Sequence, residues 1–267
     1  MFDRVVVGWD GSSAADSALD WSLQRTGALE LVVLRVLDPR AEGHPAPSAA
    51  VSASVDQVVA EAQDAHPGLR ITSAVVEGGR EQILARWATP GSLLVLGVGD
   101  RPREPGEEGL GTRIALTAAG PVALVPDGAA RRIGEVVVGI DGSEASAAAA
   151  EVAAGEAMDR RTAVVALHVR RGSAEPELRL DPDDAAGGLM GRFPRLLVRH
   201  RHVHGEPAVE LARAGAAASV LVLGRHAETD PAASVALRTL NRLGVPTIMV
   251  AEADASRPLP AFTRTAN

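Results

Sequence analysis

The chain of 267 residues contains no cysteine, no tyrosine and no lysine, and aromatic residues make up only 2% of it. Without cysteine there are no disulfide bonds, thiolate metal sites or cysteine nucleophiles. All 27 basic residues are arginine, which excludes Schiff-base chemistry, the phosphate-binding lysine of a P-loop and a receiver-type phosphoacceptor site that needs a lysine. The scarcity of aromatics predicts an aliphatic core.

Long apolar runs are missing too. None reaches the roughly 18 to 20 residues that a membrane helix requires, and "MFDRVVVGWD" places charges before a short apolar run, as a first strand does and a signal peptide does not. We therefore expect a cytoplasmic protein with no membrane contact. The net charge of -7 disfavours sequence-independent binding of nucleic acid. The length suggests two domains.

The sequence repeats itself. "VVVGWDGSS" at residues 5–13 returns as "VVVGIDGSE" at residues 136–144. Three pairs of landmarks keep a similar separation: Asp10 and Asp141 (131 residues), Gly97 and Gly224 (127), and Pro121 and Pro246 (125). A repeat of this length indicates two copies of one structural unit. We expect domains at 1–128 and 134–252, followed by a polar C-terminal tail at 253–267.

Each repeat alternates short apolar runs with helical patterns. In the first repeat we expect strands at 5–7, 29–37, 69–79, 92–100 and 121–127, helices at 13–25, 55–65, 80–88 and 112–119, and a loop at 38–54. In the second we expect strands at 136–139, 163–169, 195–205, 219–226 and 245–250, with helices at 143–158, 206–216 and 234–243. Apolar strands that alternate with helices predict two open, doubly wound α/β units with parallel sheets.

The Asp turn after the first strand of each repeat is the main functional candidate. Doubly wound sheets bind ligands beyond the carboxyl ends of their strands, at the point where strand order reverses. An aspartate between glycines places a carboxylate and free backbone N–H groups there. The alternative is structural, since Asp or Ser at such a turn also caps the following helix.

The order of the pieces, found twice, resembles the universal stress protein family in its tandem form. The matching pieces are the two Asp turns, the joints "VVEGGREQILARWA" and "VHGEPAVELARA", the strands "LLVLGVGD" and "LVLGRHA", and the closing "GPVALV" and "VPTIMV". The resemblance covers the chain apart from inserts near 38–54 and 170–190 and the tail. It implies two five-stranded sheets of the adenine nucleotide alpha hydrolase-like fold, strand order 3-2-1-4-5, arranged as an intramolecular pseudo-dimer that can itself pair further.

The resemblance also implies a nucleotide site in each repeat, with ATP as cofactor and Mg²⁺ only where ATP is bound. Aspartate would contact the adenine and a valine of the second strand would pack beside it. A glycine-rich loop of the pattern Gly-x2-Gly-x9-Gly-Ser/Thr would hold the phosphates. The implied site residues are Gly8, Asp10, Val36, Gly97, Gly111 and Thr112 in the first repeat, and Gly139, Asp141, Val169, Gly224 and Ser234 in the second.

Both phosphate loops depart from the family pattern. In the first, Asp100 takes the second glycine position, Gly111 and Thr112 come one residue late, and residues 98–112 carry four acids against two arginines. In the second, Ala233 replaces the later glycine and the loop is shorter. The sequence therefore leaves two functions open: a nucleotide-binding stress protein without turnover, or a non-nucleotide-binding member that acts through a protein partner.

Other candidate sites have weaker support. His200, His202 and His204 alternate along a strand, so their side chains share one face and would suit zinc, or else form a solvated edge strand. Ser12 and Ser143 do not lie in a nucleophile elbow, so we expect no hydrolase triad. No metal site and no catalytic residue is predicted.

Overall fold

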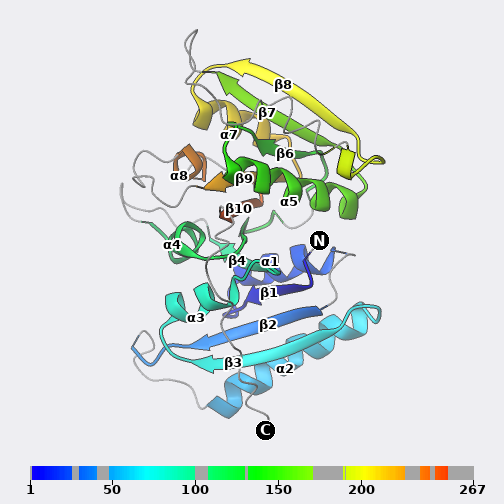
Figure 1. Cartoon of the computed structure of the whole chain (residues 1–267). Coiled ribbons are helices and arrows are strands. Elements are labelled where there is room, and N and C mark those ends of the chain that lie inside the picture. The colour runs from blue at the N-terminus through cyan, green and yellow to red at the C-terminus, as the bar shows by residue number, and fades with distance from the viewer. Residues whose placement is uncertain are drawn as a thin grey trace.

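One mixed ten-stranded sheet runs through the molecule (Figure 1). The computed structural model describes residues 2–25, 30–40, 48–99, 108–129, 132–170, 189, 191–225, 235–240 and 244–251. The strand order is β3-β2-β1-β4-β5-β10-β9-β6-β7-β8. Each half of the sheet therefore has the order 3-2-1-4-5, as the sequence predicts, and β3 and β8 form the two edges.

The expected strands are all present. In the first half they are β1 (Arg4–Gly8), β2 (Glu30–Leu37), β3 (Ile71–Glu77), β4 (Ser92–Val98) and β5 (Val122–Pro126). In the second half they are β6 (Val136–Gly139), β7 (Val164–Arg170), β8 (Val198–His204), β9 (Val220–Arg225) and β10 (Thr247–Ala251). All pairs within each half are parallel.

The two halves join through their last strands. β5 and β10 pair antiparallel, with Ala123 opposite Ile248. The two five-stranded sheets expected from the sequence therefore join into one, in keeping with the expected pseudo-dimer of the two halves. Pairing of the last strands satisfies the backbone groups that each half would leave open at that edge.

Helices cover both faces of the sheet. The described helices are α1 (Ser13–Leu23), α2 (Ser48–Ala65), α3 (Arg80–Trp87), α4 (Leu110–Thr117), α5 (Glu144–Arg160), α7 (Pro207–Ala216) and α8 (Val235–Leu240). Residues of α1, α2 and α5 pack into the core on one face, and residues of α3, α4, α7 and α8 pack on the other. None of the described helices is long and apolar enough to cross a membrane.

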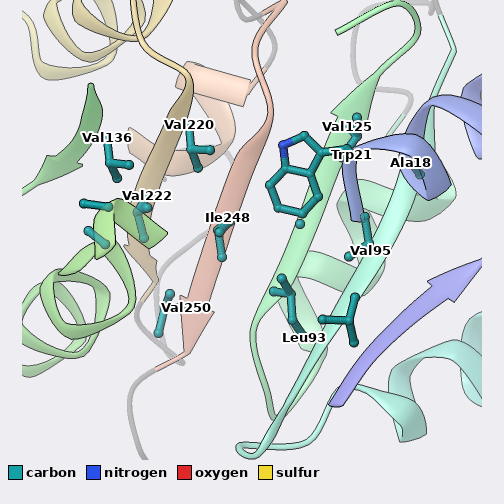
Figure 2. Close-up of a cluster of buried hydrophobic side chains, with 14 of the residues drawn as sticks. Ala18, Trp21, Leu93, Val95, Val125, Val136, Val220, Val222, Ile248 and Val250 are labelled. Carbon is teal, nitrogen blue, oxygen red and sulfur yellow. The ribbon is translucent and has the colours of Figure 1, made fainter. Parts of the chain in front are cut away.

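The hydrophobic core on the face covered by α1, α2 and α5 crosses the junction between the halves. Figure 2 shows Trp21 and Val125 of the first half near Ile248 of the second, on the face covered by α1 and α5. Trp21 is 1% exposed and Ile248 is fully buried. The apolar contact is therefore continuous from one half to the other.

Helix α2 corrects one expectation. Residues 48–54 were expected as part of a loop because they are rich in Ser and Ala and follow a Pro-rich stretch, but they form the first two turns of α2. The tail at 253–267, most of the insert at 171–190 and the phosphate-loop residues 100–107 and 226–234 lie outside the described residues.

Candidate functional site

The two Asp turns lie where strand order reverses. β1 pairs with β2 on one side and with β4 on the other, and Gly8 at its end lies opposite Leu34 and Leu96. β6 lies in the same way between β7 and β9. Asp10 and Asp141 each follow the last strand residue by two positions. The structure thus brings both predicted carboxylates to the position where this fold class binds ligands.

The first turn is fixed by hydrogen bonds to Asp10 and Ser12. The Ser12 amide donates to Asp10 Oδ1 at 3.0 Å, and Gly11 has a φ of +83°, which only glycine adopts without strain. Ser12 is the N-cap of α1, and its Oγ accepts from the Ala15 amide at 3.2 Å. Serine therefore caps the helix, and the aspartate holds the turn.

The second turn repeats this geometry. The Ser143 amide donates to Asp141 Oδ1 at 3.1 Å, and the Ser143 hydroxyl donates to the same oxygen. Gly142 has a φ of +76°, and Ser143 caps α5 by accepting from the Ser146 amide at 3.1 Å. Both aspartates are exposed, so each presents its carboxyl group to solvent beyond the carboxyl end of its strand.

Hydrogen bonds and two arginines favour the charged form of Asp10. Partial burial raises its pKa, but the hydrogen bonds from Ser12 and the nearby guanidinium groups of Arg35 and Arg80 outweigh that effect, so the pKa of Asp10 lies below its usual value. Arg35 comes from β2 and Arg80 is the first residue of α3. The carboxylate is therefore ionised at neutral pH, and both guanidinium groups are near enough to favour its charged form.

Sequence reasoning missed Arg35, Arg80 and Asp38. Asp38, just beyond β2, accepts from the Arg80 amide through Oδ2 at 3.2 Å and so caps α3. This contact joins two segments 42 residues apart, so no local pattern shows it. The available signal was a single charge, Arg35, within the apolar run "LVVLRVL" at residues 31–37.

The valines expected beside the base pack in the same core and differ in burial. Val36 is 7% exposed and belongs to the core on the α3 and α4 face. Val169 of β7 is half-buried and packs against the same core. Trp9, which the sequence places next to Asp10, donates from Nε1 to Asp16 Oδ1 at 2.8 Å, so its ring is held against α1.

The glycines predicted to bind nucleotide have packing roles. A Cβ on Gly97 would lie 2.1 Å from the Ala14 carbonyl oxygen, and one on Gly224 would lie 2.5 Å from the Ala145 carbonyl carbon. At Gly8 a Cβ would lie 2.6 Å from Leu96, and at Gly139 it would lie 3.0 Å from Leu211. Close approach of a helix backbone to the strand therefore accounts for Gly97 and Gly224 without a ligand, whereas the atoms nearest to a Cβ on Gly8 or Gly139 belong to leucine side chains.

The end of the first phosphate loop is partly described. Gly111 and Thr112 belong to the first turn of α4, and Thr112 is 7% exposed. Gly109 is the N-cap of that helix and offers no side-chain bond. Ser234 of the second loop lies outside the described residues.

An additional polar network lies beside the first turn. Asp127, at the end of β5, accepts from the Ser13 hydroxyl at 2.7 Å and from the Ser17 hydroxyl at 3.0 Å. These hydrogen bonds lower the pKa of Asp127. The network fastens the first turns of α1 to β5, and the sequence analysis did not identify it because the partners are more than 100 residues apart.

The histidine stretch lies on the edge strand β8. His200, His202 and His204 are exposed, and His202 contacts His168 of β7 edge-on, with 5.6 Å between ring centroids. Among the residues that the structure describes, no group of three or more His, Asp or Glu side chains could hold a metal ion.

Comparison with known proteins identifies relatives that cover most of the chain. The model of the Universal stress protein family matches residues 1–109. The universal stress protein Rv1996 of Mycobacterium tuberculosis is 28% identical over 271 aligned residues, which cover 83% of this chain and 85% of that protein. A universal stress protein of Mycobacterium bovis matches with the same identity and coverage.

A solved structure supports the fold. The crystal structure of a universal stress protein from Archaeoglobus fulgidus superposes with a TM-score of 0.71 over 94% of this chain and 97% of that one, at 15% identity. At this identity the likeness concerns the fold alone.

Proposed function

Because residues 1–109 match the universal stress protein family and the chain repeats the same fold in both halves, we propose that it binds an adenine nucleotide at the first Asp turn. We propose further that it senses that ligand in a stress response, without turnover. The observation that carries the proposal is the ionised Asp10 carboxylate near Arg35 and Arg80 at the switch point of the first half.

The three side chains suit the two ends of a nucleotide. The exocyclic amine of adenine is a hydrogen-bond donor, and the Asp10 carboxylate is an acceptor. Guanidinium groups bind phosphate through charge and paired N–H groups. Arg35 and Arg80 would therefore offset the acidic residues of the first phosphate loop. ATP is the proposed ligand, with Mg²⁺ only as its counter-ion.

The second half offers less to a phosphate. The residues that correspond to Arg35 and Arg80 by sequence are His168 and Pro207, so neither position holds an arginine. We propose that the Asp10 site binds more tightly than the Asp141 site, and that residues 1–128 and 134–252 act as the two domains of a cytoplasmic protein.

The test is ATP binding by calorimetry and thermal shift, with and without Mg²⁺. Asp10→Ala should weaken binding at least about tenfold, since a hydrogen bond to a charged group is lost. Asp141→Ala should have a smaller effect, and Asp20→Ala, an exposed site on α1, should have none. Failure of wild-type protein to bind ATP, or equal binding by wild type and Asp10→Ala, would refute the proposal.

Arg80→Ala separates phosphate from base recognition. It should weaken ATP binding and leave adenosine binding unchanged, because only ATP carries the charge that the guanidinium attracts. Equal loss for both ligands would show that Arg80 shapes the turn and does not contact phosphate.

A second candidate function rests on Thr112 and Gly97. Burial of Thr112 and the contact of Gly97 with Ala14 give both residues structural roles. These roles favour a member that binds no nucleotide and acts through a protein partner. Absence of nucleotide in the denatured extract, together with no ATP-induced thermal shift, would support it.

A further inference from the structure

Two residues at equivalent positions of the repeats contact each other across the junction. Arg25 lies 13 residues after the N-cap of α1, and Glu156 lies 13 residues after the N-cap of α5. The Arg25 guanidinium donates to both carboxylate oxygens, at 2.8 Å from Nη1 to Oε2. The side chains are 4% and 1% exposed. Because each is the other's counterpart, the contact lies on the pseudo-twofold axis that relates the halves.

The pair lies in a buried cluster of charged and aromatic groups. Arg160 Nε lies 3.6 Å from Glu156 Oε2. The guanidinium carbons of Arg25 and Arg160 lie 5.0 and 5.1 Å from the Trp21 ring centroid. Asp159 lies beside them, half-buried. Glu156 is therefore a buried carboxylate that contacts both cations.

A second pair on the axis differs in size. Ala123 of β5 lies opposite Ile248 of β10, both are fully buried, and they correspond in the repeats because Pro121 corresponds to Pro246 two residues earlier. A small residue thus faces a large one at the point where each would otherwise meet its own copy.

We propose that Arg25 with Glu156 and Ala123 with Ile248 form a pairing code by which a first half accepts only a second half. In a symmetric pair, the residue on the axis faces itself. Two first halves would place Arg25 against Arg25 and Ala123 against Ala123. Two second halves would place Glu156 against Glu156 and Ile248 against Ile248. Both arrangements would bury like charges. In addition, the two alanines would leave a cavity between two first halves, and the two isoleucines would overpack the junction between two second halves.

The partner that fits this surface is therefore the opposite half, from the same chain or from a second copy. The code predicts that copies with complementary changes will exchange halves. The full chain suits this test because it contains no cysteine, so introduced thiols report a single contact. Val122 lies opposite Met249 in the β5–β10 pair, and cysteines at directly opposed strand positions are within disulfide reach.

The experiment co-expresses two full-length copies. One carries Arg25→Glu with Val122→Cys, and the other carries Glu156→Arg with Met249→Cys. Within each copy the axis holds like charges, whereas between copies it holds opposite charges. We expect at least about tenfold more interchain disulfide than with the same cysteines in unchanged charge backgrounds, since an unpaired buried charge is strongly disfavoured. Non-reducing electrophoresis measures the yield.

The double variant Arg25→Glu/Glu156→Arg keeps opposite charges within one chain, so with both cysteines it should form the disulfide within the chain. Equal interchain yields in both charge backgrounds would overturn the proposal. Failure of the co-expressed copies to fold, by circular dichroism, while the double variant folds would also overturn it.

The size pair provides an independent variant without charge. One copy carries Ala123→Ile and the other Ile248→Ala, with the same cysteines. When the two copies exchange halves, each junction again pairs one large residue with one small residue. The yield of interchain disulfide should therefore exceed the yield from copies that carry the same cysteines and keep Ala123 and Ile248. If the interchain disulfide yield does not change, Ala123 and Ile248 do not contribute to the choice of partner half.

Discussion

Asp10 and Asp141 have the same local structure and different neighbours. Each accepts from the serine that caps the next helix, and this much follows from "GWDGS" and "GIDGS". Only the fold reveals that Arg35 and Arg80 approach Asp10, because they come from a separate strand and a separate helix. The sequence thus predicted the turn correctly and missed its electrostatic surroundings.

Substitution of Gly97 tests whether this glycine of the expected phosphate loop is required for packing of strand β4 against helix α1. Gly97→Ala should lower the free energy of unfolding by about 3 kcal/mol or more, because the added Cβ meets the backbone of Ala14. The control is Gly99→Ala, where a Cβ meets no atom within 4 Å and the change should stay within about 0.5 kcal/mol. Urea unfolding measures both, and equal stability of the two variants would contradict the packing role.

At the scale of elements, the sequence located the strands well and the start of α2 poorly. Strands such as β2 and β4 are continuous apolar runs, so their period is visible locally. The first turns of α2 consist of Ser, Ala and Val and are largely exposed, so they show no apolar period that would mark a helix, although alanine favours one. The buried part of α2 begins only at Val55.

Helix α1 is fastened at its first turns by Asp127, and this attachment should depend on pH. Hydrogen bonds from Ser13 and Ser17 lower the pKa of Asp127 below its usual 3.8. A lowered carboxyl pKa contributes stability above the unfolded-state value and loses it as pH falls through the folded-state value. Asp127→Asn should therefore show a smaller loss of stability on acidification below about pH 4.

The measurement for Asp127 is the urea midpoint as a function of pH. Asp20→Asn removes the same charge from an exposed site on α1 and should retain the wild-type pH dependence. If the two variants lose stability in parallel with wild type, the serine contacts do not contribute to the acid response.

For the whole molecule, the shared core and the buried ion pair predict a single unfolding transition. Glu156→Ala would leave the buried Arg25 and Arg160 without this carboxylate, which should cost about 3 kcal/mol or more and separate the unfolding of the halves. Glu151→Ala on the same helix removes an exposed pair with Arg192 and should cost less than about 1 kcal/mol.

Calorimetry checks this coupling through the ratio of calorimetric to van't Hoff enthalpy. The ratio should be near one for wild type and Glu151→Ala, and should rise for Glu156→Ala. A ratio that stays near one in Glu156→Ala would show that the β5–β10 pairing couples the halves without the ion pair.

The contact between Arg25 and Glu156 also bears on the ancestry of the duplicated chain. In a pair of identical domains this position meets its own copy, so an arginine or a glutamate there would bury like charges. Once one repeat holds arginine and the other glutamate, neither can change sign alone. The two repeats are therefore no longer interchangeable. If the gene were split at residue 130, each of the two resulting proteins would need the other to bury its charge in an ion pair.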